Sequence, residues 1–263
     1  RAAGMKVLYY IPPQLWAWRP GRARRLAAAV DRLAVVLPFE PAFFAGVGLE
    51  ATYVGHPLLD RAAAPSREAA RASLGFAPDA RVLALFPGSR AQEVRSHWAT
   101  FRAVAEHLRA AGRCDEVVAA VTPAGSYPDP GRARLVADPR MVLAAADVCL
   151  AKSGTTTLEA ALAGVPMAVA YRMHPVTFAV ARRVVTVRWV SLVNLVADRE
   201  VVPEFLQEAM TVPALVGALG DLLTPGHPAR EAQRAALAEV RGRLGSPGAS
   251  ARVADIAAEL LAT

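Results

Sequence analysis

The stretch Ala151–Glu159 is the part of the sequence that most restricts the fold. The largely apolar run Ala146–Leu150 before it is typical of a buried strand, and Leu158–Gly164 after it has a helical pattern that ends on glycine. A strand, a turn of small residues and a helix leave backbone N–H groups at the helix start, where an anion can bind. Thr156-x-x-Glu159 also fits a capping box, in which both side chains only satisfy the backbone. The spacing leaves a helix cap and a ligand site both open.

A second unit of this kind consists of a strand, Arg81–Phe86, the turn Pro87-Gly88-Ser89 and a helix, Gln92–Ala111. Ser89-x-x-Gln92 can cap that helix, which would explain the turn structurally. Arg90 argues for more, because a cation in the first helical turn opposes the helix dipole and predicts an anion nearby. Turns from neighbouring strands of one parallel sheet converge at its carboxyl edge, where open α/β folds bind ligands. Two phosphate-sized sites together predict a diphosphate.

Strand and helix signals alternate along most of the chain, which predicts parallel sheets joined by crossover helices. The further predicted strands are Met5–Ile11, Arg32–Leu37, Thr52–Gly55, Glu116–Val121, Arg134–Ala137 and Pro166–Tyr171. The Ala-rich link Asp60–Pro65 is the best domain boundary. The segment Thr122–Arg134 is too rich in proline and glycine to supply a crossover helix easily. From Pro175 onward the pattern is mostly helical and ends in Ala251–Ala262.

The 263 residues carry a formal net charge of +7. Lys6 and Lys152 are the only lysines among the 30 basic residues, so the other 28 are arginines. An excess of arginine suits phosphates, nucleic acid or an anionic membrane face, although codon bias gives the same excess. Nucleic acid is not expected as a partner, because no RNA- or DNA-binding motif is present.

Several function classes are excluded by pattern. The longest uncharged run in the second half, Ala160–Tyr171, is too short to cross a bilayer. The start of the chain has neither a signal peptide pattern nor a methionine at position 1, so a piece of a longer chain is expected. Cys114 and Cys149 are predicted to be small core residues, which agrees with a reducing compartment. No Walker lysine, Ser-His-Asp order or metal-ligand spacing appears, and four histidines are interpreted as surface or packing residues: His97, His107, His174 and His227.

Aromatic and basic residues alternate near the N-terminus: Trp16, Trp18, Arg19, Arg22, Arg24 and Arg25. They suit a phosphorylated lipid or a membrane surface. A solvated helix face beside two packed tryptophans explains them equally well. Phe178–Trp189 is a second basic and apolar stretch, with a less regular pattern.

Three further sites have both a functional and a structural interpretation. Tyr171-Arg172-Met173 ends a strand at the expected ligand edge, where the arginine could equally be an ordinary surface residue. Asn194 lies in a non-periodic segment, where asparagine usually makes a turn. His56 precedes a proline at a strand end and is placed to face a cleft.

Seven motifs, in one order across nearly the whole chain, resemble lipid-A-disaccharide synthase. They are Pro13-Gln14-Leu15-Trp16-Ala17-Trp18-Arg19, Leu37-Pro38-Phe39-Glu40, Val54-Gly55-His56-Pro57, Pro87-Gly88-Ser89-Arg90-x-x-Glu93-Val94, Ser153-Gly154-Thr155-x-Thr157-Leu158-Glu159, Tyr171-Arg172-Met173 and Ser191-Leu192-x-Asn194-Leu195. The resemblance implies an α/β protein of GT-B architecture, with two Rossmann-like parallel-sheet domains of which the N-terminal one is incomplete. The implied domains are 1–60 on the acceptor side, 61–244 for the UDP-sugar donor, and a helix in 245–263 that packs back on the first.

The resemblance also implies the reaction, an inverting transfer of 2,3-diacylglucosamine from UDP to 2,3-diacylglucosamine 1-phosphate in lipid A synthesis. No metal and no cofactor is expected, so Arg90 and the helix start at Gly154-Thr155 would neutralise the departing diphosphate. Glu159 would hold the ribose hydroxyls, and Asn194 matches a position important for activity. The implied donor-side residues are Gly88, Ser89, Arg90, Glu93, Ser153, Gly154, Thr155, Glu159, Tyr171, Arg172 and Met173, and the acceptor-side residues are Trp16, Trp18, Arg19, Arg22 and His56. The enzyme would act as a peripheral protein on the cytoplasmic face of the bacterial inner membrane.

The chain departs from the family pattern at several places. The family's N-terminal domain begins earlier and there holds a Gly-rich loop and the acidic residue thought to act as base, so this chain alone is expected to bind UDP weakly and to be inactive. Pro12, Thr156 and Val193 stand where Ser, Ala and Pro are usual. Two alternatives stay open: another UDP-sugar GT-B enzyme, such as a different membrane glycosyltransferase or a UDP-sugar 2-epimerase, and a non-catalytic UDP-sugar-binding remnant. The Trp16-Ala17-Trp18-Arg19 motif argues against the epimerase.

Overall fold

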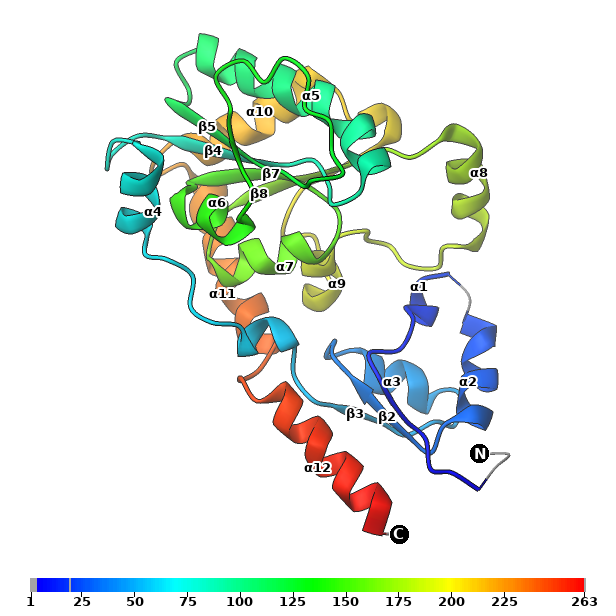
Figure 1. Ribbon diagram of the computed structural model, residues 1–263. Helices are drawn as coiled ribbons and strands as arrows, with labels where there is room; N and C mark the ends of the chain where they lie inside the picture. The colour runs from blue at the N-terminus through cyan, green and yellow to red at the C-terminus, as the bar shows by residue number, and fades with distance from the viewer. Residues whose placement is uncertain (1–3, 19, 263) are drawn as a thin grey trace. The chain divides into compact units, whose positions relative to one another are not determined.

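The computed structural model describes residues 4–18 and 20–262 (Figure 1). The chain divides into two compact units. Unit 1 contains Arg1–Ala62, Pro175–Arg188 and Gly242–Thr263, and unit 2 contains Ala63–His174 and Trp189–Arg241. Each unit has a parallel sheet with helices packed on it, which confirms the α/β class. The segment 175–188 groups with unit 1 by its contacts, whereas the sequence alone placed it within 61–244.

The sheet of unit 2 has six parallel strands in the order β6-β5-β4-β7-β8-β9. Their bounds are β4 Val82–Phe86, β5 Glu116–Ala120, β6 Arg134–Val136, β7 Val148–Lys152, β8 Met167–Tyr171 and β9 Glu204–Leu206. All five residues of β4 are buried, as expected of a central parallel strand covered on both faces. The prediction that β4 and β7 are neighbours is confirmed, since Leu83 pairs with Val148 and Phe86 with Ala151.

Within the described part of the chain, unit 2 contains seven α-helices: α4 Arg67–Leu74, α5 Ala91–Ala110, α6 Pro139–Ala145, α7 Thr155–Leu162, α9 Leu192–Ala197, α10 Val212–Leu223 and α11 Pro228–Arg243. The last two residues of α11 belong to unit 1. Helices α5 and α10 cover one face of the sheet and α4, α6 and α7 the other (Figure 1). One core cluster joins apolar residues of α5 and α10 to those of β4, β5, β7 and β8. This packing fixes the start of α5 at the carboxyl end of β4.

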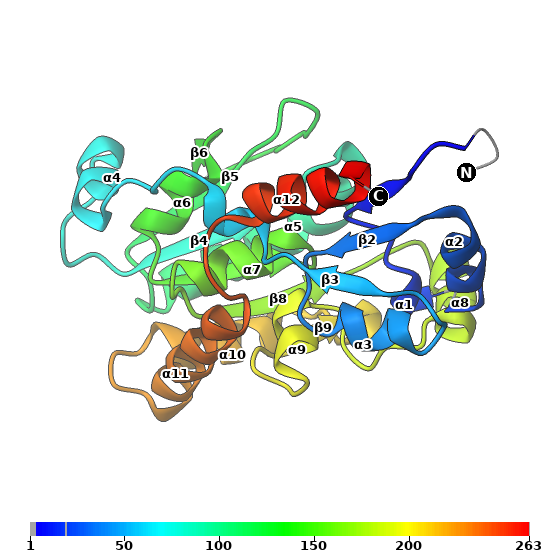
Figure 2. The ribbon, with the colours of Figure 1, turned by 90° about the horizontal axis from the view of Figure 1, so that it is seen from below.

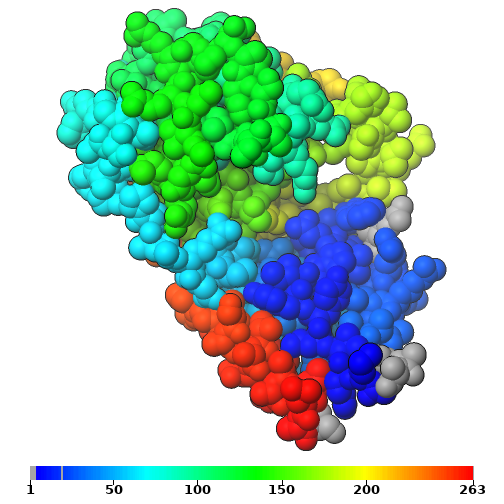
Figure 3. Space-filling model, viewed as in Figure 1, coloured from blue at the N-terminus to red at the C-terminus, as the bar shows by residue number. Residues whose placement is uncertain are grey.

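Two features of unit 2 bear on the predictions. The segment between β5 and β6 contains no helix, as its proline and glycine content indicated. This segment belongs to the green surface of unit 2 in Figure 3. The expectation of mostly helix after Pro175 is confirmed, but it did not include β9, which pairs with β8. Three residues at a sheet edge are too few to show the alternation that identifies a strand.

Unit 1 has three parallel strands in the order β1-β2-β3. They are β1 Leu8–Tyr10, β2 Arg32–Val35 and β3 Ala51–Tyr53, and the helices of the unit are α1 Leu15–Trp18, α2 Ala23–Ala29, α3 Glu40–Ala45, α8 Pro175–Val184 and α12 Ala249–Ala262. Short 3₁₀ turns occupy Pro20–Arg22 and Pro57–Asp60. A small cluster that includes Leu33, Val35 and Phe44 forms the core beside β2.

Helix α12 packs against β1, β2 and the turn Pro57–Asp60 (Figure 2). Asp60 accepts hydrogen bonds from the backbone N–H groups of Gly248 and Ser250 at the start of α12, and these bonds lower the pKa of Asp60. Arg252 donates to the carbonyl oxygens of Val54, Pro247 and Ser246. The end of the chain is therefore tied to β3 and the turn that follows it.

Candidate functional site

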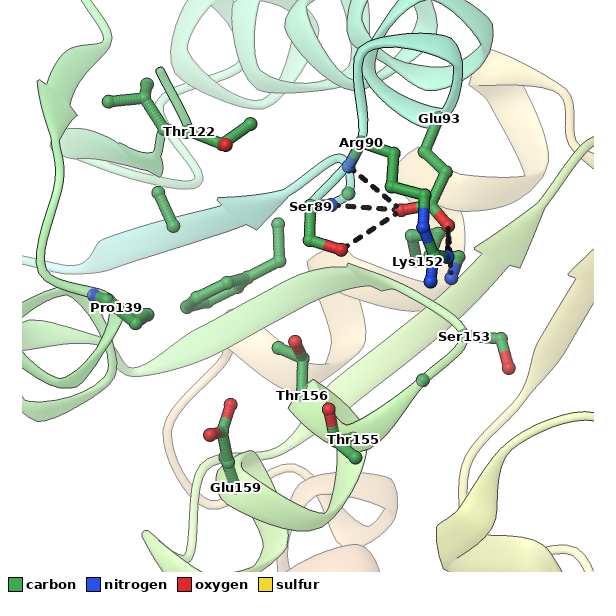
Figure 4. A pocket seen from close by; sticks show the side chains of 15 residues that line it. Ser89, Arg90, Glu93, Thr122, Pro139, Lys152, Ser153, Thr155, Thr156 and Glu159 are labelled. Atoms are coloured by element: carbon green, nitrogen blue, oxygen red, sulfur yellow. Dashed lines mark hydrogen bonds and ion pairs between the residues drawn. The ribbon is translucent and has the colours of Figure 1, made fainter. Parts of the chain in front are cut away.

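The turns after β4 and β7 line one cavity of about 410 Å³ in unit 2 (Figure 4). Its lining comes from the ends of β4, β5 and β7 and the starts of α5, α6 and α7. The lining residues are Phe86, Gly88, Ser89, Arg90, Glu93, Ala120, Val121, Thr122, Pro139, Lys152, Ser153, Gly154, Thr155, Thr156 and Glu159. Eight of the eleven predicted donor-side residues are in this lining, because parallel strands end at the same edge of the sheet.

Glycine is required in the turn after β4. Gly88 has a φ of +139°, and a Cβ there would lie 2.4 Å from the Cβ of Glu93. The turn therefore closes directly on the first turn of α5. The structural alternative, a cap made by Ser89 and Gln92, does not hold. Arg90 is the N-cap residue, and Glu93 accepts hydrogen bonds from the backbone N–H groups of Ser89 at 2.9 Å and Arg90 at 3.3 Å.

Glu93 also binds the two cations at this end of the cavity. Its Oε1 atom lies 3.1 Å from Nη1 of Arg90 and 3.0 Å from Nζ of Lys152. Burial raises the pKa of Glu93, but Lys152 and the backbone N–H of Ser89 outweigh that effect and lower the pKa to about 2. The anion predicted beside Arg90 is therefore the carboxylate of Glu93, a side chain of the protein itself. The position of Arg90 in the first helical turn does not by itself require a ligand. The Arg90 side chain is nevertheless 80% exposed and accessible to one.

The turn after β7 opens α7 without a capping box. Gly154, with a φ of +156°, is the N-cap residue and Thr155 begins the helix, so the alternative of a capping box at Thr156 does not hold. Thr157 donates from its hydroxyl to the carbonyl oxygen of Gly154. Ser153 donates to the carbonyl oxygen of Val190 at 2.6 Å, which ties the turn to the loop before α9. Glu159 lies one turn along α7, across the cavity from Arg90 (Figure 4).

Lys152 lines the cavity but was not predicted as a site residue. It is the last residue of β7, and its ammonium group lies 5.5 Å from the centre of the Tyr171 ring as well as beside Glu93. A signal was present in the sequence, because Lys152 is one of two lysines in a chain with 28 arginines and stands directly before the Ser-Gly turn.

The motif Tyr171-Arg172-Met173 lies behind the cavity rather than in its lining. The fully buried His97, in α5, stacks on Tyr171 and accepts a hydrogen bond from the backbone N–H of Arg172 through Nε2. Its Nδ1–H group donates to the carbonyl oxygen of Glu93, and burial lowers the pKa of the ring. Gln207 bonds both backbone groups of Met173. The motif connects β8 to the start of α5.

Asn194 is fully buried and does not line the cavity. Its amide oxygen accepts from the backbone N–H groups of Val201 and Val202, and its amide nitrogen donates to Glu204. Glu204 in turn accepts from the N–H of Val190, whose carbonyl oxygen holds Ser153. Asn194 is therefore connected to the turn after β7 through Glu204, Val190 and Ser153.

The predicted acceptor-side residues lie in unit 1. Trp16 is buried, donates from Nε1 to Glu40 at 3.0 Å and packs edge-on against Phe39. Trp18, 41% exposed, and Arg22 lie at the surface, and Arg19 lies outside the described residues. His56 is buried and accepts from the N–H of Leu58, and burial together with Arg61 lowers its pKa to about 4, so the ring is neutral at pH 7.

Over residues 4–18 and 20–262, no group of three or more His, Cys, Asp or Glu side chains has the arrangement of a metal site. Within that same part of the chain, no helix combines the length and the apolar character that crossing a membrane requires. Cys114 and Cys149 are buried free thiols, and burial raises the pKa of Cys114 to about 11. Neither thiol is therefore ionised near pH 7.

Comparison with solved structures supports the fold. MurG of Acinetobacter baumannii aligns with a TM-score of 0.57 at 14% identity, over 96% of this chain and 67% of that one. UDP-GlcNAc 2-epimerase of Neisseria meningitidis, solved with UDP-GlcNAc, aligns with a TM-score of 0.62 at 11% identity, over 98% of this chain and 71% of that one. At these identities the likeness shows the fold alone, which is of the GT-B glycosyltransferase class.

Sequence comparison gives the family. The family described as "Lipid-A-disaccharide synthetase" matches residues 1–238. The lipid-A-disaccharide synthase of Syntrophotalea carbinolica is 40% identical over 99% of this chain and 69% of its own length, and that of Geobacter metallireducens is 42% identical over 99% and 70%. This chain therefore spans about 70% of the length of these relatives. It belongs to the lipid-A-disaccharide synthase family.

Proposed function

We propose that this protein is an inverting glycosyltransferase that moves 2,3-diacylglucosamine from UDP to 2,3-diacylglucosamine 1-phosphate. The observation that carries the proposal is the single cavity in which the turns of Gly88 and Gly154 meet two cations, Arg90 and Lys152. Glu159 supplies a carboxylate at the far side, suited to hydroxyl groups of a ribose. Family membership and fold neighbours solved with UDP or a UDP-sugar support a nucleotide-sugar donor.

In the proposed reaction the cavity stabilises the leaving group. The bond from the anomeric carbon to the diphosphate breaks as the acceptor hydroxyl attacks from the opposite face, and negative charge collects on the phosphate oxygens. Arg90 lines the cavity, and so do Thr155 and Thr156 in the first turn of α7, where backbone N–H groups are free to bind an anion. Preorganised donors of this kind lower the barrier because they are already in place when the charge develops.

The activity is tested with the protein expressed from its full reading frame. We expect incubation with the two lipid substrates to release UDP and to form a disaccharide 1-phosphate that is heavier than the acceptor by one diacylglucosamine less one water. Recovery of an epimerised UDP-sugar would instead support the epimerase. UDP binding without turnover would support a non-catalytic remnant.

Replacing Arg90 with alanine is expected to weaken UDP binding by about 10- to 100-fold, because a hydrogen bond to a charged group contributes about 1.5–3 kcal/mol. Calorimetric titration with UDP measures the effect. Arg95→Ala is the matched control, since Arg95 is exposed on the same helix and does not line the cavity. An Arg90→Ala variant that binds UDP as tightly as the wild type would place the diphosphate elsewhere.

We further propose that unit 1 binds an anionic membrane surface through α8. Helix α8 lies in the yellow-green segment of Figure 3. Val176, Val180 and Val184 follow at helical spacing along it and are 67%, 57% and 38% exposed. Arg182 and Arg183 stand in the last turn of the same helix. An exposed apolar stripe beside arginines suits the boundary between lipid headgroups and acyl chains.

Val176→Asp is expected to weaken binding to phosphatidylglycerol vesicles about tenfold, which corresponds to the loss of one partly inserted side chain. Co-sedimentation measures the binding. Leu261→Asp on α12 is the control, because Leu261 is 83% exposed and lies on another helix. Equal losses in both variants would count against α8 as the membrane contact.

A further inference from the structure

We propose that Lys152 is a second leaving-group residue that binds the donor diphosphate together with Arg90. This inference rests on the proposed function, since it assigns a role within the same cavity. Lys152 belongs to none of the seven family motifs. Its position in the lining of the cavity, beside Glu93, indicates the role.

Lys152 lies between the two turns. Its ammonium nitrogen is 3.0 Å from Glu93, which closes the turn after β4. The same nitrogen is 3.6 Å from the position that a Cβ on Gly154 would occupy, so it also adjoins the turn after β7. The side chain is 17% exposed, and the ring of Tyr171 supports it from one side. An anion that spans both turns would meet this ammonium group.

Two cationic side chains face one carboxylate at this end of the cavity. Arg90 and Lys152 share one carboxylate oxygen of Glu93, whose other oxygen accepts from the backbone of Ser89 and Arg90. Figure 4 shows these side chains gathered on one side of the cavity, with Glu159 on the other. Two cations and one carboxylate leave a net positive charge where the turns meet, which suits a diphosphate.

The role follows from the bond that breaks. The electron pair of the bond between the anomeric carbon and the phosphate oxygen stays on UDP, which leaves with one more negative charge. The acceptor oxygen forms the new bond, and its proton passes to a carboxylate base, the acidic residue that the family resemblance implies on the acceptor side. Lys152 keeps its proton throughout and contributes an N–H donor and a positive charge in a partly buried place, where such a charge acts more strongly than in water.

The binding test compares UDP with uridine. Lys152→Met keeps the length of the side chain and removes its charge, and we expect it to weaken UDP binding at least tenfold while uridine binding stays unchanged. Lys152→Arg is expected to restore most of the UDP affinity. Lys6→Met, which removes the other, exposed lysine, is expected to change neither. A purely structural role for Lys152 would instead weaken both ligands together.

A chemical test uses the same pair of lysines in the wild-type chain. We expect saturating UDP to slow acetylation of Lys152 by an N-hydroxysuccinimide ester at least fivefold, and uridine to leave it unchanged. Lys6 serves as the internal reference in the peptide mass spectra. If the wild type binds UDP but Lys152→Met binds it equally and UDP gives no protection, the role of Lys152 is overturned and the proposed function stands. If the wild type binds no UDP, the proposed function and the role of Lys152 both fail.

Discussion

Replacing Asp147 with alanine is expected to lower the free energy of unfolding by about 3–5 kcal/mol. Asp147 precedes β7 and accepts hydrogen bonds from Arg71 at 2.8 Å, Arg67 at 2.6 Å and the backbone N–H of Val82 at 2.8 Å. Arg71 is only 2% exposed and its other partners are backbone carbonyl oxygens, so the loss of the carboxylate would leave a buried positive charge without a counter-ion. Unfolding in urea, followed by circular dichroism, measures the change.

Glu239→Ala is the control for this prediction. Glu239 pairs with Arg199 at 2.7 Å, but their side chains are 59% and 48% exposed. Exposed pairs contribute about 1 kcal/mol or less, so this variant should unfold almost as the wild type does. A loss at Asp147 no larger than the loss at Glu239 would contradict the assignment of Asp147 as the charge that makes the burial of Arg71 possible.

The second large effect is expected at Glu93 and depends on pH. Lys152 and the backbone N–H groups of the β4 turn hold the pKa of Glu93 at about 2, below its ordinary value of 4.5. A depressed pKa stabilises the folded protein above pH 4.5, and this stabilisation is lost as the pH falls toward 2. Glu93→Gln should therefore reduce the free energy of unfolding by about 3 kcal/mol at pH 7 and by almost nothing near pH 2.

Urea unfolding of wild type and variant at a series of pH values gives this difference directly. All other titrating groups change the free energy of unfolding equally in both proteins, so the difference between the two free energies at each pH is the contribution of Glu93. Glu106→Gln on the same helix is the control, because Glu106 is 52% exposed and pairs with Arg102 on the surface. If the difference at Glu93 stays constant from pH 7 to pH 2, the carboxylate does not hold the turn through its charge.

Much of the fold could be read from local patterns. The strand–turn–helix units around Gly88 and Gly154 were recognisable because buried strands, glycine turns and helix starts each have a signature within a few residues. The alternation of strands and helices gave a parallel sheet, and the sheet placed both turns at one edge. The helix-poor segment between β5 and β6 was evident from its prolines and glycines.

The roles of single side chains at the site were decided by contacts between distant parts of the chain. Glu93 was expected beside the diphosphate, yet it closes its own turn and pairs with Lys152 from another strand. The amide group of Asn194 forms hydrogen bonds with the backbone of the next loop and with Glu204, and the residue does not line the cavity. Trp16 is buried against Glu40, which agrees with the interpretation of packed tryptophans rather than with a membrane-facing side chain.

The meeting of two glycine turns at one edge of a parallel sheet follows from the order of strands and helices along the chain, and that order can be recognised before folding is considered. Which charges gather at that edge depends on contacts that form only in the folded protein. Hydrogen bonds and ion pairs such as that of Glu93 with Lys152 depend on separations of about 3 Å between residues on different elements, and no pattern within either element records that distance.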